Sequence, residues 1–203
     1  SDEFSASATE GAPVSSAKWA FDLGGDGFGN NELQVYTKSL ENIRQKDGLL
    51  QITARQSACT TKRCPCGSSY TSARIRSQKH MEQRYGRVEA RIKLPAGQGL
   101  WPAFWMLGSG FPTTPWPASG EIDIMEFRGS RPFEMSSAMH GPGYSGDKTP
   151  FVHRHGGAGW SFVDGAHTYA AEWEPGQVRF YADGVLHYTV NRSATATLGD
   201  WAF

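Results

Sequence analysis

A strict alternation of apolar and charged residues over 87–94 most constrains what this chain can fold into. The run reads Arg-Val-Glu-Ala-Arg-Ile-Lys-Leu, so every second side chain is apolar. Successive side chains of a β-strand point to opposite faces, and a period of two therefore predicts a strand with one face in a core and the other in water. We expect the chain to build sheets that are covered on one side.

Three further segments show the same pattern. Residues 177–190 hold two such runs joined by Asp183-Gly184, the dipeptide that suits a two-residue hairpin turn, and residues 167–173 and 49–54 add two more runs. No window carries a helical apolar stripe, and 24 Gly and 11 Pro interrupt the chain too often for long helices. The predicted fold is an all-β antiparallel sandwich in one domain over residues 1–203.

The charge balance excludes two classes of partner. Lys plus Arg number 20 and Asp plus Glu number 20, so there is no basic field to attract nucleic acid or an anionic membrane. No apolar run approaches the ~20 residues that span a bilayer. Several of the seven Trp stand in polar, Gly-rich contexts, and sugar rings suit such aromatic surfaces. The sequence favours a neutral partner with apolar faces.

The three cysteines lie together in a polar segment, residues 57–69, that predicts a surface loop. Because their number is odd, we expect one bridge from Cys59 to Cys64 or Cys66 and one thiol that is free or paired outside the set. A zinc site is the less favoured alternative, since no fourth ligand with suitable spacing lies nearby. The N-terminus has no signal-peptide pattern and is typical of a mature or trimmed protein.

Residues 121–126 read Glu-Ile-Asp-Ile-Met-Glu, an acidic alternation with one residue too many. In a regular strand Glu121 and Asp123 would share a face, and Glu126 would point the other way. A one-residue β-bulge around residues 124–125 would reset the alternation, place Glu126 beside the other two acids and turn Phe127 inward. The segment thus predicts three carboxylates on one surface.

Aligned acids repel one another, which a purely structural strand has no reason to accept. Glycoside hydrolysis with retention needs two carboxyl groups about 5–5.5 Å apart, one as nucleophile and one as acid and then base. The alternative is a solvated acidic strand edge. Trp101 and Trp105 precede the acids and would share a face in an extended segment; core packing and sugar stacking are both open for them.

At this point the sequence resembles glycoside hydrolase family 16, and within it the laminarinase-like endo-β-1,3-glucanases. The resemblance covers nearly the whole chain. It rests on the Glu-x-Asp-x-x-Glu pattern together with the segments 1–4, 29–34, 70–75, 85–91, 101–107, 120–127 and 183–185. It implies a jelly-roll sandwich with an open substrate cleft on the concave sheet, and no cofactor for catalysis.

The resemblance also implies a role for each acid. Glu121 matches the nucleophile, and Glu126 matches the general acid/base, whose pKa a neighbouring negative charge would raise. Asp123 matches the residue that orients the nucleophile and shares a proton with it. Five residues match positions in the substrate subsites or beside the acids, and these are Asn31, Arg74, Trp101, Trp105 and His140.

Each of these matches has a structural alternative. Arg74 could pair with any acid, Asn31 could cap a turn, and His140 could be a buried, hydrogen-bonded imidazole. The resemblance further implies a structural calcium ion held by groups such as Glu3 and the Gly48 carbonyl. His153 and His155 match no site of the family, and we interpret them as loop residues.

The sequence departs from the family pattern at its end, because family members continue beyond the counterpart of residues 201–203 with further strands. We therefore expect the domain to lack its C-terminal strands. The predicted function is endo-acting, retaining hydrolysis of β-1,3-glucan by a secreted monomer, with mixed-linkage β-1,3-1,4-glucan as a further substrate. The alternatives are hydrolysis of another β-linked polysaccharide such as a galactan, a non-catalytic β-glucan recognition domain, and a structural sandwich whose acids are incidental.

Overall fold

The computed structural model describes residues 1–5, 11–56, 70–156 and 159–203. Over these residues the chain is built of β-strands, with two short helices, η1 (Gly146–Lys148) and α1 (Arg192–Thr195). Neither helix has the length or apolar character needed to cross a membrane. The cysteine segment 57–69, with its predicted loop and disulfide, lies outside the described residues. The all-β prediction is confirmed.

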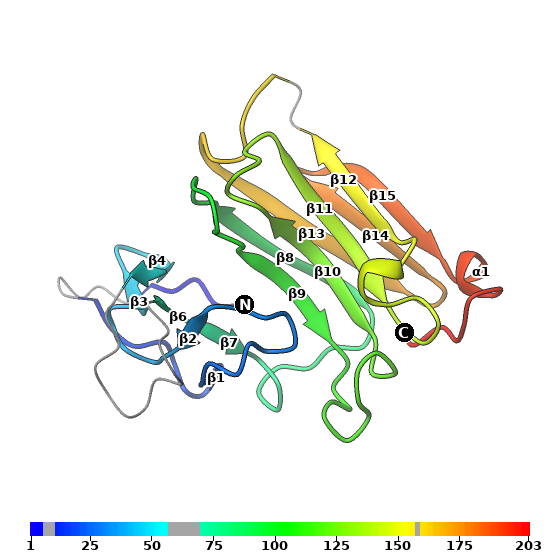
Figure 1. Ribbon diagram of the computed structural model, residues 1–203, viewed down its shortest axis with the longest axis horizontal. Helices are drawn as coiled ribbons and strands as arrows, with labels where there is room; N and C mark the ends of the chain where they lie inside the picture. Colours follow the sequence, from blue (N-terminus) through cyan, green and yellow to red (C-terminus); the bar gives the residue numbers. More distant parts are fainter. Residues whose placement is uncertain (6–10, 57–69, 157–158) are drawn as a thin grey trace. The chain divides into compact units, whose positions relative to one another are not determined.

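The chain divides into two compact units, Ser1–Glu82 and Gln83–Phe203, which are described separately. The larger unit contains two four-stranded antiparallel sheets (Figure 1). Sheet I has the order β12-β11-β10-β9, with β9 (Ala103–Leu107), β10 (Glu121–Phe127), β11 (Glu134–His140) and β12 (Val152–Gly156). Sheet II has the order β15-β14-β13-β8, with β8 (Gly86–Lys93), β13 (Ala166–Glu174), β14 (Gln177–Ala182) and β15 (Val185–Asn191).

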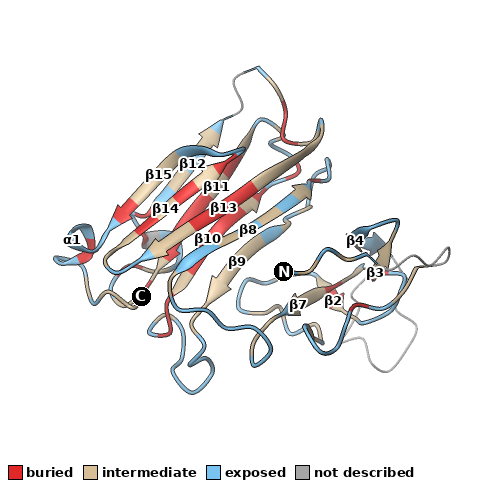
Figure 2. Cartoon of the chain, turned by 180° about the vertical axis from the view of Figure 1, so that it is seen from behind, coloured by how far each residue is buried: buried red, intermediate tan, exposed pale blue. Residues whose placement is uncertain are grey.

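One apolar core fills the space between the two sheets. Sheet I contributes Ile122 and Phe127, and sheet II contributes Tyr169, Phe180 and Val190, all of them buried (Figure 2). Two sheets that face each other across such a core form a β-sandwich, so the predicted architecture is confirmed for this unit.

The period-two predictions hold where the pattern was clearest. In β8 the apolar side chains Val88 and Ile92 are partly buried and pack on the core, while the charged residues between them are exposed. The β14–β15 hairpin turns at Asp183 and Gly184, with φ of 48° and 76°. Two successive positive φ angles are what a two-residue turn needs to match the twist of its strands.

The smaller unit consists of short pairings around a core of Val14, Ile43 and Ala73. Its strands are β1 (Ala20–Asp22) with β7 (Arg74–Arg76), β3 (Ile43–Lys46) with β4 (Leu49–Ile52), and β2 (Gln34–Tyr36) with β6 (Tyr70–Ser72) and β5 (Arg55–Gln56). The strand predicted at 49–54 is β4. Contrary to the purely antiparallel prediction, β2 and β6 run parallel. Parallel neighbours need a long crossover, which residues 37–69 provide.

Candidate active site

The acids lie on β10, which is one of the two inner strands of sheet I and has β9 and β11 as its neighbours. Against β11, Asp123 pairs with Ala138 and Glu126 with Ser136, so three steps on β10 correspond to two on β11. The register against β9 shifts at the same place. One extra residue is therefore inserted between Asp123 and Glu126, and the predicted bulge is confirmed.

The bulge sets which side chains face the core. Ile124 and Met125 are consecutive in sequence, yet both are buried in the core cluster, together with Ile122 and Phe127. Because Ile124 and Met125 both point inward, the alternation of side chains is shifted by one residue after them. Glu121, Asp123 and Glu126 consequently lie on the opposite face of sheet I, which leaves Glu121 and Glu126 partly exposed and Asp123 only 3% exposed.

Side chains of the same unit hold each acid in place. The Trp116 indole N–H donates to Glu121 Oε2 at 2.6 Å, and the Trp101 indole N–H donates to Glu126 Oε1 at 3.2 Å. His140 Nε2 lies 3.1 Å from Asp123 Oδ2. Both tryptophans are substantially exposed, Trp101 at 49% and Trp116 at 42%, so their rings are open to a ligand while their N–H groups bind the acids.

The electrostatics of the three carboxyl groups favour protonation. Burial raises the pKa of Glu121 to about 8, aided by the charge of Asp123 and a hydrogen bond with it. Burial also raises the pKa of Asp123 to about 8, with a further contribution from the charge of Glu126. Glu121 and Asp123 share a hydrogen bond, so the pair is expected to retain a proton near neutral pH.

The pKa of Glu126 is raised as well, and burial is the leading cause. The negative charge of Glu121, which we predicted as the reason, adds to the shift, whereas His140 and the Trp101 hydrogen bond oppose it. A carboxyl group whose pKa lies above its ordinary value suits a general acid that must carry a proton into the reaction. The direction of the predicted shift is thus correct, but its cause is mainly desolvation.

Three of the five residues predicted for the substrate subsites, Trp101, Trp105 and His140, therefore lie beside the acids. Trp105 lies directly opposite Asp123 in the β9–β10 register, and paired residues of antiparallel strands share a face. His140 lies opposite Glu121 in the β10–β11 register. One ligand atom from each of Glu121, Asp123 and His140 lies within 4.8 Å of the others.

Asn31 and Arg74 belong to the smaller unit, which is described by itself. Arg74 donates from Nε to Asp22 Oδ2 at 3.0 Å, and its guanidinium carbon lies 4.9 Å from the centre of the Phe28 ring. Asn31 is exposed and has a positive φ of 55° in the turn before β2. Their substrate-binding roles stay predictions.

Glu3 and Gly48, the predicted calcium ligands, also lie in the smaller unit, and both are exposed. Gly48 occupies the β3–β4 turn with φ of 73°. Calcium takes six to eight oxygen ligands. Among the described residues, no group of three or more His, Cys, Asp or Glu side chains near one another includes Glu3. The calcium site therefore gains no support from the geometry.

One residue of the site was missed by sequence reasoning. Trp116 lies in an irregular segment between β9 and β10 that is rich in Pro, Gly, Ser and Thr, and it has no periodicity that would assign its direction. Only the fold shows that its indole reaches Glu121, and that its ring lies 6.0 Å from that of His140. Proximity in sequence to the acids was the one available signal.

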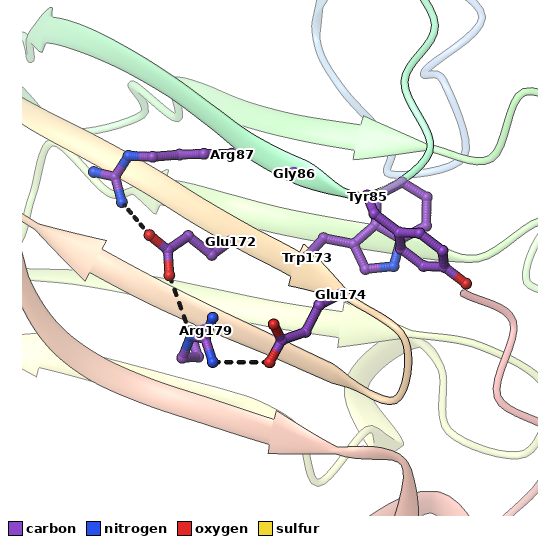
Figure 3. Close-up of a pocket in the computed structure, with 7 residues that line it drawn as sticks. All are labelled: Tyr85, Gly86, Arg87, Glu172, Trp173, Glu174 and Arg179. Carbon is purple, nitrogen blue, oxygen red and sulfur yellow. Dashed lines mark hydrogen bonds and ion pairs between the residues drawn. The ribbon is translucent and has the colours of Figure 1, made fainter.

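A hollow of about 420 Å³ lies elsewhere, over sheet II (Figure 3). Glu172 accepts hydrogen bonds from Arg87 at 3.1 Å and Arg179 at 3.2 Å, and Arg179 also donates to Glu174 at 2.9 Å (Figure 3). The charged side chains that line the hollow are thus paired with each other. None of the predicted site residues lines it. It offers no unpaired acid or nucleophile, so the chemistry is assigned to β10.

The chain is similar to a family of known proteins. The family model described as "Glycosyl hydrolases family 16" matches residues 30–202. The chain is 36% identical to the glucan endo-1,3-beta-glucosidase A1 of Niallia circulans over 203 residues, which is 93% of this chain and 28% of that protein. It is 38% identical to the beta-glucanase of Rhodothermus marinus, over 91% of this chain and 63% of that protein.

A solved structure shows the same fold. The endo-beta-1,3-glucanase of Pyrococcus furiosus superposes with a TM-score of 0.89 at 37% identity, covering 100% of this chain and 77% of that one. The chain thus spans less than two thirds of the length of the two relatives named above.

Proposed function

Because this chain belongs to glycosyl hydrolase family 16, we propose that it is an endo-acting, retaining hydrolase of β-1,3-glucan that also accepts mixed-linkage β-1,3-1,4-glucan. One observation carries the proposal: the β10 bulge places Glu121, Asp123 and Glu126 on one face, with indole N–H groups on the first and the last. The named activities of the relatives from Niallia circulans and Rhodothermus marinus support the substrate class.

In the first step Glu126 gives its proton to the glycosidic oxygen, while the Glu121 carboxylate attacks the anomeric carbon. The bond to the leaving sugar breaks, and an ester joins the remaining sugar to Glu121. In the second step Glu126, now a carboxylate, removes a proton from water as the water oxygen attacks the same carbon. The ester breaks, Glu121 is released as a carboxylate and the configuration is retained.

We infer that the shared proton rests on Asp123 in the resting enzyme, although the hydrogen bond between the two groups by itself raises the pKa of Glu121 and lowers that of Asp123. Asp123 is the more deeply buried member of the pair, and burial penalises the charged form most. Glu121 accepts the Trp116 N–H, which favours its ionised form. A protonated Asp123 can donate to Glu121 and so keep the nucleophile charged and correctly turned. We infer that Asp123 positions Glu121 and follows its charge through both steps.

Product analysis on laminarin, lichenan and agarose tests the proposal. The unaltered chain should release oligosaccharides from laminarin and more slowly from lichenan. Glu121→Ala and Glu126→Ala should each lose activity, the latter by about 10²–10⁴-fold, the usual contribution of general acid catalysis. Glu89→Ala is the matched control, because Glu89 is exposed on β8 of sheet II and should leave the rate unchanged.

The outcomes also separate the alternatives. Products from agarose alone would favour a galactan hydrolase, and glucan binding without products would favour a recognition domain. Undiminished hydrolysis by either acid variant would contradict the assigned roles. Proton NMR of the first products should show the β-anomer; an initial α-anomer would mean inversion and a different pairing of the carboxyl groups.

We further propose that the protein acts outside the cell as a monomer, since its substrate is a polymer. Immunodetection in the culture medium of the source organism and the mass in solution test these two points. The calcium ion implied at Glu3 and Gly48 is tested by melting the protein with calcium and with a chelator. An unchanged melting temperature would exclude a stabilising ion.

A further inference from the structure

Three histidines meet where the edges of the two sheets come together. β12 is one of the two edge strands of sheet I, and β15 is one of the two edge strands of sheet II. His153 and His155 alternate with exposed residues along β12 and are themselves partly buried. His155 lies opposite the core residue Met135, and its ring centre is 6.2 Å from that of Phe162. The two imidazoles therefore point between the sheets, and they are strand residues rather than the loop residues we predicted.

The third histidine, His187, is turned toward them by a second β-bulge. Phe180 pairs with Tyr188 and Tyr181 pairs with Leu186, so His187 is an extra residue of β15. Its side chain packs inward beside Tyr188, whereas Leu186 is 49% exposed. An unbulged alternation from Val190 and Tyr188 would have put leucine inside and histidine outside. The bulge exchanges an apolar side chain for an imidazole, which apolar packing alone does not favour.

The three rings form a stack with unsatisfied polar atoms. The His187 ring centre lies 4.7 Å from that of His155 and 5.5 Å from that of His153. One ring nitrogen from each residue lies within 4.8 Å of the others. Both nitrogens of His187 are buried and have no hydrogen-bond partner among the described residues.

We propose that His153, His155 and His187 form a three-imidazole site for a divalent transition-metal ion, with Zn²⁺ as its simplest occupant. Neutral imidazole is a preferred ligand of Zn²⁺ and Cu²⁺, whereas Ca²⁺ and Mg²⁺ select oxygen. Zn–N bonds of about 2.0–2.1 Å require nitrogens about 3.3 Å apart in a tetrahedral site. Because the rings are stacked at interplanar angles of 21° and 25°, they must turn about their side-chain bonds for the three nitrogens to converge on one ion. A fourth position is then left for water or an anion.

Such an ion would join the edge strands of the two sheets. β12 and β15 are not hydrogen-bonded to each other, and each has only one strand neighbour in its sheet. A ligand that binds the native state and not the unfolded chain stabilises the native state by RT ln(1 + [L]/Kd), where [L] is the free ligand concentration. The site therefore predicts a metal-dependent rise in melting temperature that is independent of glycoside hydrolysis.

The test uses the whole, untagged chain after treatment with a chelator. Isothermal titration with Zn²⁺ should show a site of one ion per chain, and the melting temperature should rise by several degrees at about 100-fold excess over the dissociation constant. His187→Phe keeps a ring of similar size and removes two unpaired nitrogens. It should melt no lower than the unaltered apoprotein and should lose the Zn²⁺-dependent rise.

Two other ligand groups must be separated from this one. Glu121, Asp123 and His140 could hold an ion, and three cysteines lie outside the described residues. His155→Gln is a second disrupting variant, and His80→Ala, at an exposed turn of the smaller unit, is the matched control. Co²⁺ substitution should give the visible bands of a tetrahedral nitrogen site without a thiolate charge-transfer band. Zn²⁺ binding that is unchanged in both His187→Phe and His155→Gln, or a thiolate band, would overturn the proposal.

Discussion

At the scale of single residues, each of two indoles donates a hydrogen bond to a different carboxyl group of the candidate site. Each tryptophan presents its ring to solvent and its N–H to a carboxylate, Trp116 to Glu121 and Trp101 to Glu126. A hydrogen bond to the ionised form of a carboxyl group lowers its pKa. The indoles therefore oppose burial, which raises the pKa of both acids, and each one adjusts a different catalytic group.

This division predicts that the two tryptophan variants shift different limbs of the pH profile. Trp116→Phe removes a donor to the Glu121 carboxylate, so the pKa of Glu121 should rise and the acidic limb of kcat/KM should move to higher pH. Trp101→Phe does the same for Glu126, whose deprotonation sets the alkaline limb, and that limb should move to higher pH instead. Each shift should be about one to two pH units, since hydrogen bonds to charged groups contribute about 1.5–3 kcal/mol.

Each variant is the other's control, because both replace an exposed indole by a phenyl ring. A shared loss of ring stacking changes KM in both without moving either limb. If Trp116→Phe moved the alkaline limb and Trp101→Phe the acidic one, the roles of Glu121 and Glu126 would have to be exchanged.

At the scale of elements, the β10 bulge joins the core to the site. Met125 is 1% exposed and faces the core because one residue is inserted before Glu126. Met125→Ala should lower the free energy of unfolding by about 2–5 kcal/mol through the cavity that it leaves. Met81→Ala is the control, since Met81 is 55% exposed and its truncation should cost less than about 0.5 kcal/mol. Urea unfolding measures both.

Equal stability of the two methionine variants would contradict the burial of Met125. Activity adds a second measurement. A cavity beside the bulge loosens the spacing of the acids, so Met125→Ala should lower kcat at temperatures where the protein is still folded.

The β14–β15 turn offers a test of backbone conformation alone. Gly184 has φ of 76°, and an added Cβ would meet no atom within 4 Å. Gly184→Ala should therefore cost about 1–2 kcal/mol from the left-handed conformation only. Gly165→Ala is the matched control, because Gly165 is equally open and has no positive φ. Thermal melting of the two variants should differ by several degrees, and equal melting temperatures would contradict the turn geometry.

Sequence patterns predicted elements where local rules were sufficient. The alternation of β8, the Asp183-Gly184 turn and the β10 bulge each follow from a few consecutive residues. The β15 bulge was not predicted, because Leu186, Tyr188 and Val190 alternate as a regular strand would. The inward direction of His187 depends on pairing with β14, which is not encoded within the segment itself. The positions of Trp116 and Trp101 beside the acids depend likewise on how loops return to β10.

At the scale of the whole molecule, acidic and basic residues balance in number, but three acidic groups lie close together on β10. Lys plus Arg and Asp plus Glu are equal at 20 each. The buried carboxyl groups on β10 nevertheless have raised pKa values, so the folded chain holds protons that the unfolded chain releases. Linkage then fixes the sign: this contribution stabilises the protein fully below the unfolded pKa of about 4, and it is lost as pH rises toward about 8.

Asp123→Asn should therefore raise the melting temperature at pH 8 while abolishing most of the activity. The amide has the shape of the protonated acid, and it removes the charge whose burial is unfavourable. At pH 4 the difference between the variant and the unaltered chain should disappear, because the carboxyl group is then protonated in the folded protein. A melting temperature that is lower than that of the unaltered chain at both pH values would show that Asp123 is needed as a charged partner.

β10 is paired on both sides, with β9 and with β11, and this fixes more than the fold. Moving one of its carboxylates relative to the others would require breaking backbone hydrogen bonds or removing the bulge. The spacing of the three carboxyl groups is thus fixed by the backbone before any ligand binds. If the proposed function is correct, the adaptation must come from the polymer, whose sugar ring has to distort to fit between Glu121 and Glu126. Polysaccharides that are flexible at the linkage between Glu121 and Glu126 should be hydrolysed faster than stiff, straight ones.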